Sequence, residues 1–149
     1  MIRPILIGAV AGMRSMLPLA AISYAARQRK PPRDRALLRL LGQPLTGTSL
    51  LALAVGELLG DKWRAAPDRI SAAGLAARIT TGALAGAALA APDERRSAAI
   101  VGAGAAVMAS YVSFALRVGA MNRFGRVRTG LAEDALALAA TLYLVNRAK

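Results

Sequence analysis

The stretch SAAIVGAGAAVMASYVSFAL, residues 97–116, carries no charged side chain over the length of a membrane crossing. At about 1.5 Å per residue, a helix of this length covers the roughly 30 Å hydrocarbon core of a bilayer. The rest of the 149-residue chain agrees, because 56% of its residues are hydrophobic and only 19% are charged, against about 25% charge in soluble domains. We therefore expect residues 1–149 to form a single all-α integral membrane domain.

Five apolar segments, separated by loops rich in Arg and Lys, are expected to form transmembrane or partly re-entrant helices. Their bounds are residues 4–26, 46–60, 70–91, 97–116 and 131–145. The second and the fifth are short for a crossing, about 22 Å as helices, so spanning and re-entry both stay open for them. In residues 36–45, Arg39 and Gln43 interrupt a run of leucines, which predicts a short amphipathic helix at the membrane surface.

The order of long and short segments predicts an inverted repeat, with helices one and two and helices four and five arranged around helix three. The tripeptide MRS at residues 13–15 has an echo in MAS at residues 108–110, and a short acidic segment follows each. A single linking helix turns the second copy upside down in the membrane, as in many transporters. The alternative is that such echoes arise by chance in a sequence rich in Ala and Gly.

Charged residues inside the apolar segments are candidates for a site that binds an ion or a small polar solute. A charge at the bilayer centre costs at least about 2.5–3.5 kcal/mol, so it faces protein or water and finds a partner. The predicted site comprises two deep arginines and four acids of the short segments: Arg14, Arg78, Glu57, Asp61, Glu133 and Asp134. The alternatives for the acids are a solvated helix end and, for Glu133 and Asp134, the first turn of a helix, where carboxylates are favourable.

Two local details bear on this predicted site. Pro18 has no N–H, so the carbonyl of Arg14 loses its helical partner, and a kink beside a guanidinium is predicted in mid-membrane. Glu57 and Asp61 are four residues apart, so on a helix their carboxylates share one face and repel each other unless a cation, proton or arginine intervenes. The sequence leaves undecided whether these acids bind a metal.

Small and polar residues on the helix faces predict how the helices pack. Three GxxxG elements predict close approach of helices; their glycines are Gly8 and Gly12, Gly56 and Gly60, and Gly82 and Gly86. These faces are expected to pack within the chain, and a homodimer through one of them is the alternative. Ser110, Ser113 and Arg117 form one stripe of the fourth segment and are expected to line a polar path, or else to hydrogen-bond between helices.

The composition excludes several kinds of catalytic site. The chain has no His and no Cys, which rules out His-ligated zinc, Ser-His-Asp and Cys-His nucleophiles, and iron–sulfur centres. The net charge of +12 would suit nucleic acid, but the basic residues lie between apolar segments, where loops meet lipid headgroups. We expect the lipid bilayer as the partner, no nucleic acid, no cofactor and no enzymatic activity.

The Lys and Arg residues of the loops predict the orientation in the membrane. With five crossings, eight of these residues lie on the side of the amino terminus and ten on the other side, including six in residues 27–39. The positive-inside rule then places the amino terminus outside the bacterial inner membrane and the basic first loop in the cytoplasm. The small difference leaves dual insertion open.

Several short motifs in this order are typical of one family. They are Gly12-Met13-Arg14 followed by Pro18, ELLGDK at residues 57–62 with Pro67 after it, Arg117, and LAEDA at residues 131–135. Together they resemble the bacterial membrane proteins grouped as domain-of-unknown-function family 4126, over nearly the whole chain. The resemblance implies a small polytopic inner-membrane protein without an assigned activity. It adds weight to the positions that match the pattern, whereas the basic stretch 27–39 departs from it. The matching positions are Arg14, Glu57, Asp61, Lys62, Glu133 and Asp134.

Two functions of different classes stay open on the sequence. The first is a small transporter or channel, in which Glu57, Asp61 and Glu133 bind a cation or proton. In it, Arg14 and Arg78 balance the charge or hold an anionic group. The second is a non-catalytic scaffold that packs partner helices through its GxxxG faces. A membrane enzyme ranks third, because no nucleophile–base pair accompanies the carboxylates.

Overall fold

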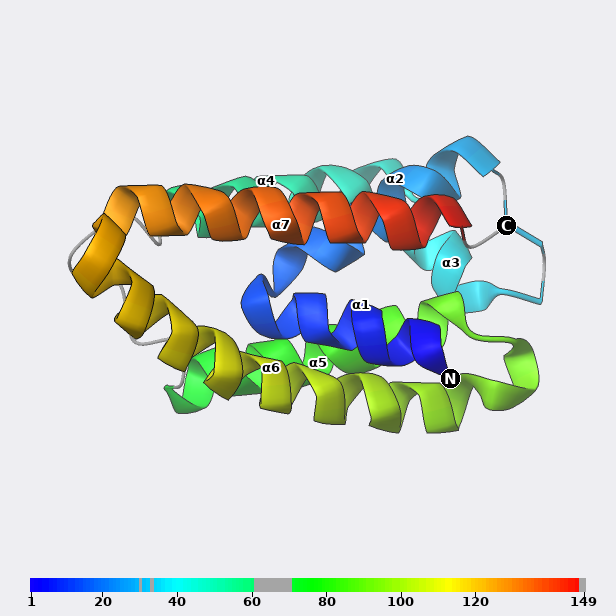
Figure 1. Ribbon diagram of the computed structural model, residues 1–149. Coiled ribbons are helices and arrows are strands. Elements are labelled where there is room, and N and C mark those ends of the chain that lie inside the picture. Colours follow the sequence, from blue (N-terminus) through cyan, green and yellow to red (C-terminus); the bar gives the residue numbers. More distant parts are fainter. Residues whose placement is uncertain (30, 33, 61–70, 148–149) are drawn as a thin grey trace.

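The computed structural model describes residues 1–29, 31–32, 34–60 and 71–147, and every regular element among them is a helix. The all-α prediction is therefore confirmed for this part of the chain. The elements are α1 (Ile2–Met13), α2 (Met16–Arg29), α3 (Ala36–Leu41), α4 (Pro44–Gly60), α5 (Ala72–Leu89), the 3₁₀ helix η1 (Pro92–Glu94), α6 (Arg95–Phe124) and α7 (Arg126–Arg147). They form an elongated bundle with both chain ends at one end of it (Figure 1).

The first apolar segment folds back on itself. Helix α1 runs from the amino terminus into the bundle, and α2 returns from the middle to the same end (Figure 1); Arg3 and Arg29 there line a common cavity. As helices, α1 and α2 are about 18 and 21 Å long, too short to cross a bilayer. The prediction of one helix over residues 4–26 is wrong, because the segment is a hairpin of two half-length helices.

The break between the two helices has a local cause. Arg14 has an extended backbone, with φ −140° and ψ 108°, and α2 begins two residues later. Pro18 then lies in the first turn of α2, where a missing N–H costs nothing because no intrahelical acceptor exists for it. The proline therefore starts a new helix instead of kinking a continuous one.

This hairpin has no counterpart in the second half of the chain as far as the structure describes it. Residues 97–116 lie within the single continuous helix α6, whereas residues 4–26 are divided between α1 and α2. The two segments that the inverted repeat would pair thus differ in form. The described residues give the predicted repeat no support.

Helices α6 and α7 extend beyond the apolar segments from which they were predicted. Helix α6 runs from Arg95 to Phe124 and α7 from Arg126 to Arg147, with Gly125 at φ 83° between them. A prediction from hydropathy ended these helices where arginines begin, although Arg is a good helix former. As a result Glu133 and Asp134 lie in the third turn of α7, so their placement in a first helical turn is wrong.

Glycines bring α1, α5 and α6 into close contact. Gly8 of α1 lies against the backbone of Gly102 in α6, and a Cβ on Gly82 of α5 would lie 2.7 Å from the carbonyl oxygen of Gly102. Gly12 and Gly86 approach the α6 backbone in the same way, at Ala106 and Ala98. No described atom lies within 4 Å of a Cβ built on Gly56 or Gly60 of α4. Four of the six GxxxG glycines therefore serve packing within the chain.

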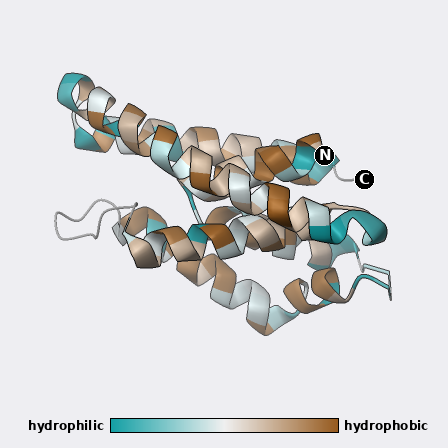
Figure 2. Ribbon diagram, turned by 90° about the horizontal axis from the view of Figure 1, so that it is seen from below, coloured by the Kyte–Doolittle hydropathy of each residue, from teal (hydrophilic) through white to brown (hydrophobic). Residues whose placement is uncertain are grey.

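The outside of the bundle is apolar. Two stretches, Ala72–Leu89 and Pro92–Phe124, are long and apolar enough to cross a membrane, while Ile2–Met13 and Pro44–Gly60 are apolar but shorter. Large side chains point outward along several helices; examples are Leu59 (62% exposed), Ile100 (74%), Leu116 (69%) and Leu136 (62%). Hydrophilic residues gather at the ends of the helices (Figure 2).

Candidate functional site

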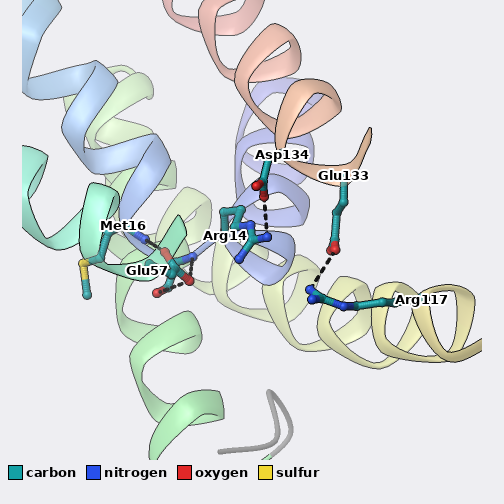
Figure 3. A network of polar contacts seen from close by, with 7 residues as sticks. Arg14, Met16, Glu57, Arg117, Glu133 and Asp134 are labelled. Atoms are coloured by element: carbon teal, nitrogen blue, oxygen red, sulfur yellow. Dashed lines mark hydrogen bonds and ion pairs between the residues drawn. The ribbon is translucent and has the colours of Figure 1, made fainter. Parts of the chain in front are cut away.

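The break between α1 and α2 brings together most of the charged residues singled out in the sequence. Four of them, Arg14, Glu57, Arg78 and Asp134, contact the break or lie in it. Arg14 lies in the break, whereas Glu57, Arg78 and Asp134 come from α4, α5 and α7. Glu133 and Arg117 form a neighbouring pair (Figure 3). Asp61 and Lys62 lie outside the described residues.

Glu57 binds the start of α2. One carboxylate oxygen, Oε1, accepts hydrogen bonds from the backbone N–H and the hydroxyl of Ser15, at 2.8 and 3.0 Å. The other oxygen, Oε2, accepts the backbone N–H of Met16 at 3.0 Å. The first N–H groups of a helix have no intrahelical acceptor, and the helix dipole favours a negative charge there. Glu57, which belongs to α4, supplies both the hydrogen-bond acceptors and the negative charge.

At the end of α1 the roles are reversed, because there a backbone carbonyl accepts hydrogen bonds from side chains. The carbonyl oxygen of Gly12 accepts a hydrogen bond from Nε of Arg78 at 3.1 Å and another from the hydroxyl of Ser110 at 3.3 Å. Arg78 also donates from Nη1 to the carbonyl of Gly74 at 3.0 Å. A cation is favourable at a helix C-terminus. Each half-helix end at the break therefore meets a charge of the sign that its dipole prefers.

Arg14 occupies the break itself and forms an ion pair with Asp134 of α7 (Figure 3). Its side chain is 2% exposed and that of Asp134 is 14% exposed. A buried ion pair recovers its desolvation cost only with close geometry and further hydrogen bonds. The backbone N–H of Arg14 donates to the carbonyl of Val10 at 2.8 Å, which fixes the residue to the end of α1.

A second ion pair joins α6 to α7. Nη1 of Arg117 lies 3.2 Å from Oε2 of Glu133, and the two side chains are 9% and 10% exposed. The adjacent acids Glu133 and Asp134 thus meet different arginines, one on α6 and one in the break between α1 and α2. Neither acid has the setting of a solvated helix end.

The charges of the site balance among the described residues. Three arginines (Arg14, Arg78 and Arg117) lie with three acids (Glu57, Glu133 and Asp134). Uncompensated charges are expensive away from water, whereas a neutral set of paired groups is tolerated. The site can therefore exist in an apolar surrounding, and any added or removed proton or ion would unbalance it.

The polar stripe of α6 makes contacts between and within helices. The Ser110 hydroxyl, which is buried, lies 2.7 Å from the carbonyl of Ala106 as well as near Gly12. Ser113 donates to the carbonyl of Ser110 at 3.3 Å. For Ser110 the structure has the interhelical hydrogen bond that was the alternative to a polar path.

One residue of the site was missed in the sequence. Ser15 is 7% exposed and gives Glu57 two of its three hydrogen bonds. Ser is favoured at the N-cap of a helix, and Pro is tolerated in the first turn, so the order Ser15 to Pro18 is compatible with a helix start. Reading residues 15–18 in this way would have located both the break and the residue that begins α2.

The part of the chain that the structure describes contains no group of three or more acidic side chains placed to hold a metal ion. The acids of the site contact backbone N–H groups, a hydroxyl and arginines instead. The chemistry of the site is thus that of charge pairs and helix ends.

Comparison with known proteins identifies the family but not the activity. No curated protein and no solved structure matches the chain. A family model matches residues 4–147, which include every residue of the site. The resemblance noted in the sequence is therefore confirmed, and the chain belongs to the family described as Domain of unknown function (DUF4126).

Proposed function

We propose that the protein is a small multi-pass membrane transporter or channel for an ion or a small polar solute, with its site at the break between α1 and α2. The observation that carries the proposal is the broken hairpin, which holds the Arg14–Asp134 pair between the ends of two half-helices. In many transporters, discontinuous helices near the bilayer midplane form the binding site in this way.

The apolar exterior supports membrane insertion. Soluble monomers rarely expose contiguous apolar patches of more than a few hundred Å². Here exposed leucines and valines continue along α4, α6 and α7, and α5 and α6 meet the length and hydropathy of membrane spans. In this proposal α4 to α7 cross the bacterial inner membrane and α1 and α2 re-enter it.

The distribution of arginines supports one orientation. The bundle end with both termini holds the start of α1, the end of α2, α3, the start of α6 and the end of α7 (Figure 1). The described arginines of these segments are Arg3, Arg27, Arg29, Arg35, Arg39, Arg95, Arg96 and Arg147. The junction of α6 and α7 lies at the opposite end (Figure 1), and its arginines are Arg123, Arg126 and Arg128. The positive-inside rule places the first end in the cytoplasm. The basic loop of residues 27–39 thus stays in the cytoplasm, as expected from the sequence, and only the amino terminus moves from the outside to the cytoplasm, because that expectation counted residues 4–26 as a full crossing.

The position of the charges supports a transport role. Arg78 and Asp134 lie well inside α5 and α7 and not at their ends. Ionisable residues at such depth are rare and usually mark ion or substrate pathways. A proton or cation at Asp134, or an anion at Arg14, would compete with the ion pair and loosen the contact between the hairpin and α7. Binding would thereby favour a second conformation of the hairpin.

Flux measurements on reconstituted protein test the proposal. Liposomes containing the protein are tested for proton flux with an internal pH dye, and for currents after concentration jumps of Na⁺, K⁺, chloride and phosphate. We expect a saturable response to at least one of these probes. The Asp134→Asn variant is expected to lose it, and the matched variant Asp93→Asn, which removes an exposed carboxylate at the bundle end, is expected to keep it.

A second variant separates transport from folding. The double variant Arg14→Leu/Asp134→Leu removes both charges, and such replacements of buried ion pairs are often neutral for stability. A folded double variant without flux supports the site. Unchanged flux in a folded double variant, or no response of the wild-type protein to any of the probes, would count against it.

A second candidate function is a scaffold for partner helices, and one observation favours it. The Gly56–Gly60 element of α4 has no described neighbour within 4 Å, whereas the other two elements pack inside the chain. Gly56→Leu is the test, since it would block a close helix contact without altering the central site. Loss of a copurifying partner or of a dimer in this variant, with flux unchanged, supports the scaffold.

A further inference from the structure

We infer that the cavity between Arg3, Arg29 and Arg35 binds the phosphate headgroup of an anionic phospholipid. The cavity has a volume of about 300 Å³ and lies at the bundle end that carries both chain termini. The inference rests on the membrane insertion proposed above, but it does not depend on the central charge site.

The walls of the cavity combine positive charge with apolar surface. Its three arginines come from the start of α1, the end of α2 and the loop before α3. Among the described residues, no Asp or Glu lines it, and its other lining residues are apolar, such as Ile22, Leu38 and Leu89. Arginine is well suited to phosphate because its planar guanidinium donates two parallel hydrogen bonds.

The end of α7 helps to hold one of these arginines in place. Nη1 of Arg29 lies 3.5 Å from the carbonyl oxygen of Val145, close to the end of α7. Val145 and Leu89 also line the cavity, so it lies where α2, α5 and α7 meet. A ligand in the cavity would therefore contact the end of the α1–α2 hairpin and two of the proposed crossing helices at once.

The position of the cavity favours a lipid over a soluble anion. It lies at the basic end of the bundle, the end that the arginine count assigns to the cytoplasmic headgroup layer. Basic pockets between helices on this side of a membrane bind anionic lipid headgroups. The apolar lining adds a surface for the first acyl carbons, which inorganic phosphate and glycerol phosphate do not have.

Lipid titration in detergent tests the inference without a membrane. The intact protein is titrated with phosphatidylglycerol, with phosphatidylcholine and with soluble glycerol phosphate, and bound molecules are counted by native mass spectrometry. We expect phosphatidylglycerol to bind at least about tenfold more tightly than phosphatidylcholine. Each arginine at a lipid surface contributes about a fivefold change in affinity, so Arg3→Gln/Arg29→Gln should weaken binding about 25-fold.

A charge-matched control identifies the cavity. Arg39→Gln/Arg96→Gln removes two exposed arginines from the same bundle end, but neither lines the cavity. We expect this control to change the affinity less than about threefold. Equal losses in the two double variants, equal binding of the two lipids, or equally tight binding of glycerol phosphate would each overturn the inference.

The two proposals fail separately. The Asp134→Asn variant is expected to lose flux while it binds phosphatidylglycerol as the wild-type protein does. Absence of lipid selectivity with flux intact would reject the cavity alone. Lipid selectivity without any flux would reject the central transport site alone.

Discussion

The guanidinium of Arg14 lies against the carboxylate of Asp134, so that the break in the first apolar segment is joined to the last helix of the chain. Arg14 is 2% exposed, and the carbonyl before the break and the N–H groups after it are bound by Arg78, Ser110 and Glu57. The hairpin is thereby attached to α4, α5, α6 and α7 at one level. A change at any of these contacts would therefore alter the packing of the hairpin against the other helices.

A double-mutant cycle tests the energy of this contact. Arg14→Leu leaves the Asp134 carboxylate without its cation, and Asp134→Leu leaves the guanidinium without its anion; each is expected to cost about 3–5 kcal/mol. The double variant should recover most of this loss, because it leaves no unpaired charge. The free energy of unfolding in mixed detergent micelles is the measurement, and additive losses would show that the two residues are not coupled.

Glu57 is expected to control the first turn of α2. In Glu57→Ala the N–H groups of Ser15 and Met16 lose their acceptor, at a cost of about 1–3 kcal/mol for a buried unsatisfied group. Amide hydrogen exchange at the start of α2 should accelerate, while that of α5 and α6 should change little. Glu94→Ala is the matched control, since Glu94 is exposed and is expected to leave α2 unaffected. Exchange that rises equally in both variants would argue against the cap.

The sequence predicts much of this site because charges in apolar segments are costly. That cost identifies Arg14, Arg78, Glu57 and Asp134 as residues that need partners, and the structure places them around one break. The sequence does not identify which acid meets which arginine. Those pairings depend on how α4 and α7 pack against the hairpin, and no local pattern records such contacts.

The path of the first segment was harder to predict. Hydropathy averages over a window and does not distinguish a continuous apolar helix from two antiparallel halves. The distinction depends on Ser15 and Pro18, which favour a helix start, and on Glu57, which supplies the acceptors that make the start stable. The ends of α6 and α7 were missed for a related reason, since arginines there continue the helices instead of ending them.

Two glycines of α6 form a matched pair for testing the packing. A Cβ on Gly102 would meet the carbonyl oxygen of Gly82, whereas a Cβ on Gly104 would meet no described atom within 4 Å. Gly102→Ala is expected to destabilise the protein by about 1–3 kcal/mol through overpacking. Gly104→Ala should be neutral or stabilising, because Ala favours a helix over Gly by about 1 kcal/mol. Thermal unfolding in detergent compares the two, and equal midpoints would contradict the close contact of α5 and α6.

The re-entrant hairpin predicts a topology that differs from that of a single first crossing. The chain has no Cys, so single cysteines at Ile2, Gln28 and Asn122, all exposed, report the side of the membrane through an impermeant thiol reagent. If α1 and α2 form a hairpin, Ile2→Cys and Gln28→Cys are labelled from the cytoplasmic side and Asn122→Cys from the outside.

A continuous helix over residues 4–26 would instead place Ile2 and Gln28 on opposite sides. Labelling after permeabilisation controls for reactivity at each position. The labelling tests two parts of the proposal. Labelling of Ile2→Cys and Gln28→Cys from one side tests the hairpin, and the identity of that side tests the orientation predicted from the arginines. With the hairpin, α4 to α7 make an even number of crossings, so both termini must lie on the side that carries the basic end.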